Sequence, residues 1–212
     1  MQAIANKGAG SILAEIAAVI VDNKAYLSEI DGKIGDGDHG INMAKGFGRA
    51  AQDLDPDGTL TDAMEVLSNV LMTEIGGSMG PLYGMMFSDM AEALGDAEMI
   101  DPKTFSAMLR AGHDGVQGIG NAQVGDKTLL DTLSPALESF DKAIADGQSF
   151  ADALASMKAA AEVGRDSTID LVAKLGRSAR LGERSRGVLD AGATSCCLIL
   201  SGFADGISAR LT

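Results

Sequence analysis

The stretch Asp31-Gly32-Lys33-Ile34-Gly35-Asp36-Gly37-Asp38-His39-Gly40-Ile41-Asn42 lies between two long apolar segments. Its first ten residues hold three carboxylates and four glycines. Carboxylates this close repel one another, and a bound hard cation such as Mg2+, which prefers oxygen ligands, relieves that repulsion. The glycines let the backbone bend sharply and approach a ligand closely. The stretch therefore predicts a loop that binds a metal ion together with a phosphate group.

Apolar residues recur at helical spacing on both sides of this loop and through most of the chain. Eight helices are predicted, over residues 11–30, 40–54, 59–75, 81–94, 101–120, 128–146, 150–175 and 191–211. Pro135, inside the sixth helix, predicts a kink or break there. Aromatic residues make up only 4% of the chain, and its Ala-rich segments favour helices over strands. The expected fold class is all-α, with a single domain over residues 1–212.

The connections between these helices are mostly short, which favours antiparallel neighbours in an up-and-down bundle or a closed helical barrel. Alternate loops of such a fold gather at one end. The loops after the first, third, fifth and seventh helices are the glycine-rich ones, at residues 31–42, 76–80, 120–128 and 176–192. We therefore expect these four loops to converge at one end, where the helix that begins at Gly40 would present its N-terminus to phosphate.

Other interpretations of the glycine loops fail because of their context. Residues 35–40 match a dinucleotide-binding fingerprint, but they follow a helix instead of a strand. An EF-hand loop that starts at Asp36 would place Phe47 where a bidentate Glu is needed. Residues 120–128 approach a P-loop, but Asp126 intrudes before the Lys-Thr pair and no strand precedes them. Zinc is disfavoured because the candidate ligands are carboxylates. A Mg2+ site that holds a phosphate chain remains.

Composition limits the partners and the location. The net charge of −13 disfavours direct binding of nucleic acid or of an anionic membrane. The chain has no run of about 18 apolar residues and no signal-peptide pattern at its N-terminus, so a cytoplasmic protein is expected. Cys196 and Cys197 are adjacent in an apolar stretch, which indicates reduced core residues.

The roles of the arginine cluster of residues 177–186 and of His39 stay open from the sequence alone. Four arginines fall within residues 177–186, and they form either a solvated loop or a flap that contacts phosphates. His39 adjoins the acidic loop and is a phosphate donor, a phosphohistidine or a mere neighbour. No Ser-His-Asp or Cys-His arrangement stands out, so no catalytic residue of the protein's own is assigned.

Residues 34–43 resemble the signature of the dihydroxyacetone kinase L subunit family, or of the equivalent C-terminal domain of one-chain dihydroxyacetone kinases. The likeness continues, in family order, through residues 76–82, 125–131, 181–185 and 190–195. Each block is short, but together the blocks span nearly the whole chain. The resemblance implies an eight-helix barrel that holds a nucleotide, ADP or ATP, and two Mg2+ ions at one end.

The resemblance also implies the residues of that site. Its metal ligands would be Asp31, Asp36 and Asp38. Its nucleotide contacts would be His39, Gly40, Ile41, Asn42, Ser78, Met79, Gly120, Leu129, Arg177, Asp190, Ala191 and Gly192. Met79 stands where a Ser is expected, which leaves a backbone contact there instead of a hydroxyl contact. The segment 176–186 would cover the nucleotide.

By the same resemblance, the chain would be the phosphoryl-donating subunit of a kinase. It would pass phosphate from Mg-ATP, or from bound ADP that a phosphotransferase-system M subunit rephosphorylates, to a ketose held by a separate K subunit. A transcription regulator is a further expected partner, and a homodimer is expected. Three alternatives stay open: an ADP-loaded regulatory module, a kinase subunit for another short ketose such as erythrulose, and a helical Ca2+/Mg2+-binding protein without nucleotide.

Overall fold

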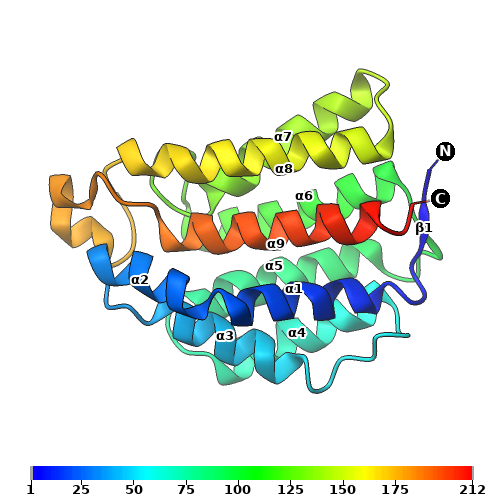
Figure 1. Ribbon diagram of the computed structural model, residues 1–212, viewed down its shortest axis with the longest axis horizontal. Coiled ribbons are helices and arrows are strands. Elements are labelled where there is room, and N and C mark those ends of the chain that lie inside the picture. The colour runs from blue at the N-terminus through cyan, green and yellow to red at the C-terminus, as the bar shows by residue number, and fades with distance from the viewer. Residues whose placement is uncertain (1, 212) are drawn as a thin grey trace.

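The computed structural model describes residues 2–211, and that range is built almost entirely of helices (Figure 1). Its α-helices are α1 (Gly10–Asp22), α2 (Lys24–Ile34), α3 (His39–Ala50), α4 (Leu60–Glu74), α5 (Met79–Leu94), α6 (Pro102–Gly120), α7 (Leu130–Ala145), α8 (Phe150–Ser167) and α9 (Ala191–Ser208). Two 3-10 segments, η1 (Thr168–Asp170) and η2 (Ser178–Ser185), precede α9. The all-α class predicted from the sequence is confirmed.

The helices close into a ring that follows chain order. α1 packs against α3, α3 against α4, and each later helix against the next as far as α9, which returns to α1. Since α2 continues the first predicted helix, this is the expected eight-helix barrel. Figure 1 shows both termini at one end of the barrel and α2, together with the orange segment before α9, at the other end.

The first predicted helix, residues 11–30, is in fact two helices that meet at Asn23. The Asn23 side-chain amide donates to the carbonyl of Val19 at 2.8 Å, and its backbone N–H donates to the same oxygen at 3.1 Å. Such local side-chain bonds compete with continuation of a helix. α2 then runs on to Ile34, so Asp31 lies on a helix and the loop itself is only residues 35–38.

The seventh predicted helix, residues 150–175, ends earlier, at Ser167. The Ser167 hydroxyl donates to the Gly164 carbonyl at 2.7 Å, and the Thr168 hydroxyl donates to the Arg165 carbonyl at 2.6 Å. These bonds close the last turn of α8. The chain then leaves the barrel as the segment of residues 168–190, which we call the cap segment.

Of the kink or break predicted at Pro135, the break is absent, because α7 runs through Pro135 without interruption. Pro135 cannot donate to the carbonyl of Asp131, one turn earlier. Gly164 of α8 packs against this spot, and a Cβ atom on it would lie 2.3 Å from the Asp131 carbonyl oxygen. The glycine therefore lets α8 approach α7 closely where the proline stands. A short antiparallel pairing of β1 (Ile4–Ala5) with β2 (Met99–Ile100) was not predicted.

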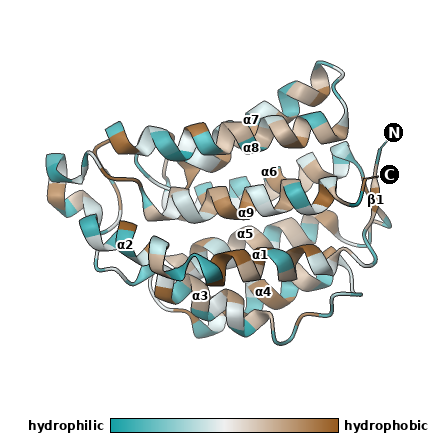
Figure 2. Ribbon diagram, in the orientation of Figure 1, coloured by the Kyte–Doolittle hydropathy of each residue, from teal (hydrophilic) through white to brown (hydrophobic). Residues whose placement is uncertain are grey.

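The core is apolar along the inner faces of the helices, and Figure 2 shows brown residues along α1 and α9 in the middle of the view. Phe105 packs against the rings of Phe140, Phe150 and Phe203 at centroid distances of 5.1, 6.0 and 6.4 Å. α9 is long and apolar enough to cross a membrane by length and composition alone, although Thr, Ser and Asp residues interrupt its apolar sequence. Because 67% of its residues are buried in the bundle, α9 is a core helix.

Candidate metal and phosphate site

A cavity of about 410 Å3 lies at the end of the barrel that carries α2 and the cap segment. Its walls come from the end of α2 and the start of α3, from residues 76–79, from residues 120–130, from residues 175–178 in the middle of the cap segment and from residues 190–192 at its junction with α9. The volume lies within the range of small-molecule sites. The four glycine-rich loops therefore do converge, as their positions after alternate helices predicted. We call this space the end cavity.

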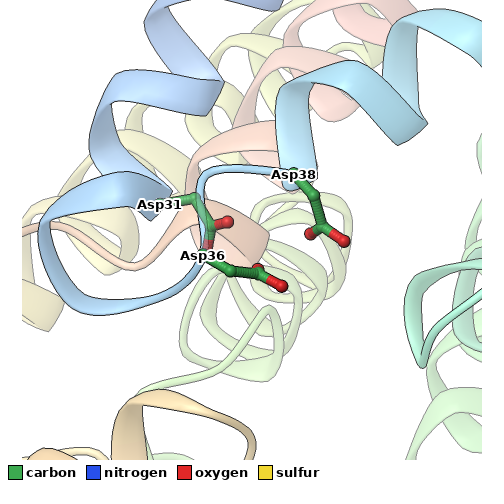
Figure 3. Close-up of side chains that lie close together, drawn as sticks. All are labelled: Asp31, Asp36 and Asp38. Atoms are coloured by element: carbon green, nitrogen blue, oxygen red, sulfur yellow. The ribbon is translucent and has the colours of Figure 1, made fainter.

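Three carboxylates meet at one edge of the end cavity (Figure 3). Asp31 lies on the last turn of α2, Asp36 in the loop, and Asp38 directly before α3. One carboxylate oxygen from each lies within 4.8 Å of the others. Burial raises the pKa of Asp38, and the negative charges of Asp36 and Asp31 raise it further. Three converging oxygen ligands under mutual repulsion suit a hard divalent cation such as Mg2+.

Glycines make this crowded arrangement possible. A Cβ atom on Gly35 would lie 2.4 Å from a carboxylate oxygen of Asp31, and Gly37 has a φ of 76°. A Cβ atom on Gly40 would lie 2.1 Å from the carbonyl oxygen of Lys24, so α3 begins in direct contact with α2. The backbone N–H of His39 donates to Asp31 at 3.3 Å, which joins the start of α3 to the carboxylate cluster.

Arg177 of the cap segment reaches across the end cavity and pairs with Asp36. Both side chains are substantially exposed, at 63% and 37%. The guanidinium supplies positive charge beside the cluster of carboxylates, and its charge lowers the pKa of Asp38 against the other influences. Arg177 therefore brings the segment of residues 176–186 into contact with the acidic loop, and residues 176–178 of this segment line the end cavity.

Lys127 holds the base of the cap segment. Its ammonium lies within hydrogen-bond distance of four backbone carbonyl oxygens, of Thr168 (2.7 Å), Leu171 (3.2 Å), Ser185 (2.7 Å) and Val188 (2.6 Å), which share its three hydrogens. The side chain is only 1% exposed, and this burial lowers its pKa. The lysine of the P-loop-like stretch thus donates its hydrogens to carbonyls of the protein. A P-loop lysine would instead contact phosphate, so this agrees with the rejection of a P-loop.

Asp131 and Asp190 support the loops around Lys127. Asp131 is buried and accepts from the backbone N–H groups of Gly125 (2.5 Å) and Thr128 (2.6 Å). Asp190 caps α9 by accepting from the N–H of Ala193 at 2.7 Å. Burial raises the pKa of Asp190 to about 6, with the charge of Asp131 adding to the rise.

His39 takes part in a chain of buried hydroxyls. Its Nε2 lies 2.9 Å from the Ser195 hydroxyl, which lies 2.7 Å from the hydroxyl of Tyr83. Burial lowers the pKa of His39 to about 4, against a smaller rise caused by Asp31. A histidine in this setting is a neutral hydrogen-bonding group near pH 7.

Most of the residues predicted for the site line the end cavity. These are Asp31, Asp36, Asp38, His39, Asn42, Ser78, Met79, Gly120, Leu129, Arg177, Asp190, Ala191 and Gly192. Gly40 and Ile41 are not in its wall. Gly40 packs against α2, and the side chain of Ile41 is 51% exposed on the outer surface. Both belong to the first turn of α3, so only their backbone is near the cavity.

Sequence reasoning missed the supporting residues Tyr83, Lys127 and Ser195. Tyr83 lies one helical turn after Met79 and hence on the same face of α5, which was the available signal. Ser195 lies within a block that carried the family resemblance. For Lys127, nothing in the sequence indicates that its partners are carbonyls 41 to 61 residues away.

Comparisons with known proteins agree with this geometry. The DAK2 domain family matches residues 33–205. The chain is 36% identical over 183 residues to PEP-dependent dihydroxyacetone kinase 1, ADP-binding subunit DhaL, of Listeria innocua, covering 85% of this chain and 86% of the relative. It is 37% identical to the PEP-dependent ADP-binding subunit DhaL of Escherichia coli, covering 82% and 84%. It is 38% identical to the PTS-dependent subunit of Lactococcus lactis, covering 83% and 84%.

Larger kinases match as well. The chain is 33% identical to D-erythrulose kinase of Mycolicibacterium smegmatis, covering 91% of this chain and 34% of that one. The crystal structure of the dihydroxyacetone kinase from C. freundii in complex with AMP-PNP and Mg2+ aligns with a TM-score of 0.70 at 24% identity. That alignment covers 97% of this chain and 35% of the C. freundii chain, and it shows a shared fold. This chain belongs to the DAK2 domain family and, within it, to the dihydroxyacetone kinase L subunits.

Proposed function

We propose that this protein is the nucleotide-binding, phosphoryl-donating subunit of a dihydroxyacetone-type kinase. The observation that carries the proposal is the convergence of Asp31, Asp36 and Asp38 with the N-terminus of α3 on one cavity of about 410 Å3. Carboxylates, a helix N-terminus and glycine loops at one place are what a metal-bound phosphate chain requires. Family membership supports the same activity.

Each part of the end cavity has a role in this proposal. The two Mg2+ ions, held by the three aspartates, would neutralise charge on the transferring phosphoryl group. The first backbone N–H groups of α3 and the loop of residues 76–80 would orient the phosphates. Arg177 would contact the nucleotide from above, since its guanidinium reaches the edge of the metal site. The protein would supply positioning and charge stabilisation, with no nucleophile of its own.

We further propose that the bound nucleotide is ADP, which stays in place and is rephosphorylated by an M subunit. The relatives of matching length are named ADP-binding subunits of PEP-dependent or PTS-dependent kinases. Use of free ATP is the competing route. The erythrulose kinases support a second short ketose as the acceptor, and that choice would belong to the K subunit.

The K subunit would dock at the mouth of the end cavity, because the phosphoryl group must reach a hydroxyl held by another chain. Ile119, Val124 and Leu175 are exposed by 46%, 62% and 38%. Leu175 lines the cavity, and Ile119 and Val124 stand within two residues of Gly120 and Ala122, which also line it. Exposed apolar side chains grouped at one place are typical of a protein interface.

The remaining expectations stay predictions. They are a single domain over residues 1–212, a cytoplasmic location, a homodimer, contact with a transcription regulator, and no direct binding of nucleic acid or membrane.

One experiment tests the function. The purified protein is denatured, any released nucleotide is identified, and a second sample is tested for exchange with labelled ATP. Tightly held ADP that does not exchange supports the M-subunit route, whereas free exchange supports an ATP-dependent kinase. A sample that carries no nucleotide and binds neither Mg-ADP nor Mg-ATP contradicts the proposal. Adding a K subunit and ketone then separates the donor subunit, which forms phosphorylated ketone, from a regulatory module, which forms none.

A further inference from the structure

His39, Ser195 and Tyr83 come from three helices and meet behind the end cavity. Nε2 of His39 lies 2.9 Å from Oγ of Ser195, and that Oγ lies 2.7 Å from the hydroxyl of Tyr83. Both hydroxyls also lie 3.1 Å from the carbonyl oxygen of Gly192. Ser195 is 0% exposed and Tyr83 is 1% exposed, so water does not replace these partners.

The number of available hydrogens decides which group donates. The Gly192 carbonyl can only accept, while each hydroxyl donates one hydrogen. If either hydroxyl donates to this carbonyl, the other supplies the hydrogen of the Tyr83–Ser195 bond. No hydroxyl hydrogen is then left for His39, and the contact of 2.9 Å is a hydrogen bond only if Nε2 itself donates. The alternative, in which Ser195 donates to His39, forms two hydrogen bonds here instead of three.

The opposite ring nitrogen is left for the cavity. Within residues 2–211, Nδ1 of His39 has no hydrogen-bond partner, and it is not among the fully buried atoms that lack one. His39 lines the end cavity. With the proton on Nε2 in a neutral ring, Nδ1 carries a lone pair and can only accept.

We propose that Ser195 and Tyr83 are positioning residues that hold His39 with its proton on Nε2, so that Nδ1 offers a hydrogen-bond acceptor to the bound nucleotide complex. The inference rests on the proposed function insofar as the end cavity takes a nucleotide. The ligand group at Nδ1 is then a donor, a hydroxyl or amino group of the nucleotide or a metal-bound water. A phosphate oxygen, which is itself an acceptor, does not bind there.

The test is 15N NMR of the imidazole nitrogens at pH 8, above the ordinary histidine pKa of about 6.5. The chain has only two histidines, so the spectrum is simple. We expect Nε2 of His39 to resonate as a protonated nitrogen and Nδ1 as an unprotonated one in nucleotide-free protein. The opposite assignment overturns the inference.

The same NMR measurement on variants tests which residues hold the tautomer. Ser195→Ala removes the acceptor of the Nε2 proton, so the signals of both His39 nitrogens should shift toward a mixture of tautomers. Tyr83→Phe should shift them less, and it serves as the independent variant if Ser195→Ala does not fold. Ser134→Ala is the matched control, because Ser134 makes the corresponding contact with Nε2 of the other histidine, His113, at 2.9 Å. It should move only the His113 signals.

Ligand addition separates this inference from the proposed function. A change at Nδ1 with Mg2+ alone assigns the donor to metal-bound water, and a change only with Mg-ADP assigns it to the nucleotide. Mg-ADP affinity should fall about three- to tenfold in Ser195→Ala, the size of one hydrogen bond, and should stay unchanged in Ser134→Ala. Binding of Mg-ADP that leaves Nδ1 unchanged, or His39 signals that neither Ser195→Ala nor Tyr83→Phe moves, overturns the inference. The expected tautomer in a protein that binds no nucleotide overturns the proposed function instead.

Discussion

Lys127 and Arg177 each connect the cap segment to a glycine-rich loop at the same end of the barrel, but under different physical conditions. Lys127 is 1% exposed and shares its hydrogens among four carbonyls, whereas the side chain of Arg177 is 63% exposed and pairs with Asp36. Hydrogen bonds to a buried charge are strong and costly to break, while exposed ion pairs are screened by water and salt. The lysine is therefore a permanent attachment, and the arginine is free to exchange Asp36 for another partner.

Removing the permanent attachment should have the largest effect. Lys127→Met should lower the free energy of unfolding by about 3–5 kcal/mol, because the carbonyls around the ammonium lose their donor. The cap segment should also become sensitive to protease. Urea denaturation followed by circular dichroism measures the first effect, and limited proteolysis measures the second.

Lys142→Met is the matched control. Lys142 is exposed and pairs with Asp146 one turn later at 2.5 Å, an arrangement worth only about 0.3–0.5 kcal/mol. If Lys127→Met costs no more than this control, the buried contacts do not hold the cap segment.

Removing a charge from the acidic loop should weaken ligand binding without lowering the free energy of unfolding. Asp38→Asn should weaken binding of Mg-ADP by about a hundredfold or more, since a charged ligand of the metal is lost. The unfolding free energy of metal-free protein should stay equal or rise slightly, because the charges of Asp36 and Asp31 oppose ionisation of Asp38. Calorimetric titration measures the binding, and unfolding in the presence of EDTA measures the stability.

Asp57→Asn is the control for this change, because Asp57 is an exposed carboxylate in the turn between α3 and α4. It should leave both quantities unaltered. Equal nucleotide content in wild type and Asp38→Asn would show that the three aspartates do not hold the metal.

These two sites differ in how far the sequence predicts them. The acidic loop is predictable because its ligands lie within eight residues and its glycines are required locally, as the contact between Gly35 and Asp31 illustrates. The convergence of the glycine loops is predictable because helix order alone sets which loops share an end. Family resemblance then supplied Arg177, which sits beside the carboxylates.

The role of Lys127 is not predictable in this way. Its partners are backbone carbonyls, which every residue carries, so no residue type marks them in the sequence. The link from His39 through Ser195 to Tyr83 likewise joins three helices that are distant in the chain. The division of the first predicted helix at Asn23 was not predicted, because apolar residues keep their helical spacing across it. The side-chain amide of Asn23 nevertheless ends α1.

Asp190 is influenced by the charges of both Lys127 and Asp31, and it should control the pH dependence of stability. Its pKa of about 6 exceeds the ordinary value of 3.8, so the folded state binds more protons between pH 4 and 6. Stability from this group is complete below about pH 4 and is lost as the pH rises through 6. His39, with a pKa of about 4 against 6.5, has the opposite sign, since stability rises over a similar window.

The two contributions partly cancel in the wild type, and Asp190→Asn should separate them. Asparagine keeps the cap of α9 but does not ionise. The unfolding free energy of the variant relative to wild type should therefore increase by about 2–3 kcal/mol from pH 4 to pH 7. Urea denaturation across this range measures the difference. A constant difference would mean that Asp190 ionises normally in the folded protein.

Arg177→Ala should have the smallest effect on stability, below about 1 kcal/mol, because its pair with Asp36 is exposed. The rate of nucleotide release should nevertheless rise several-fold, since the arginine lies across the mouth of the end cavity. Arg180→Ala, in the same segment and exposed, should change neither quantity. Stopped-flow release of a fluorescent ADP analogue, beside urea denaturation, measures both. If Arg177→Ala destabilises the fold as much as Lys127→Met, the arginine is a structural attachment like the lysine, and the acidic loop is not free to exchange it for a metal ion.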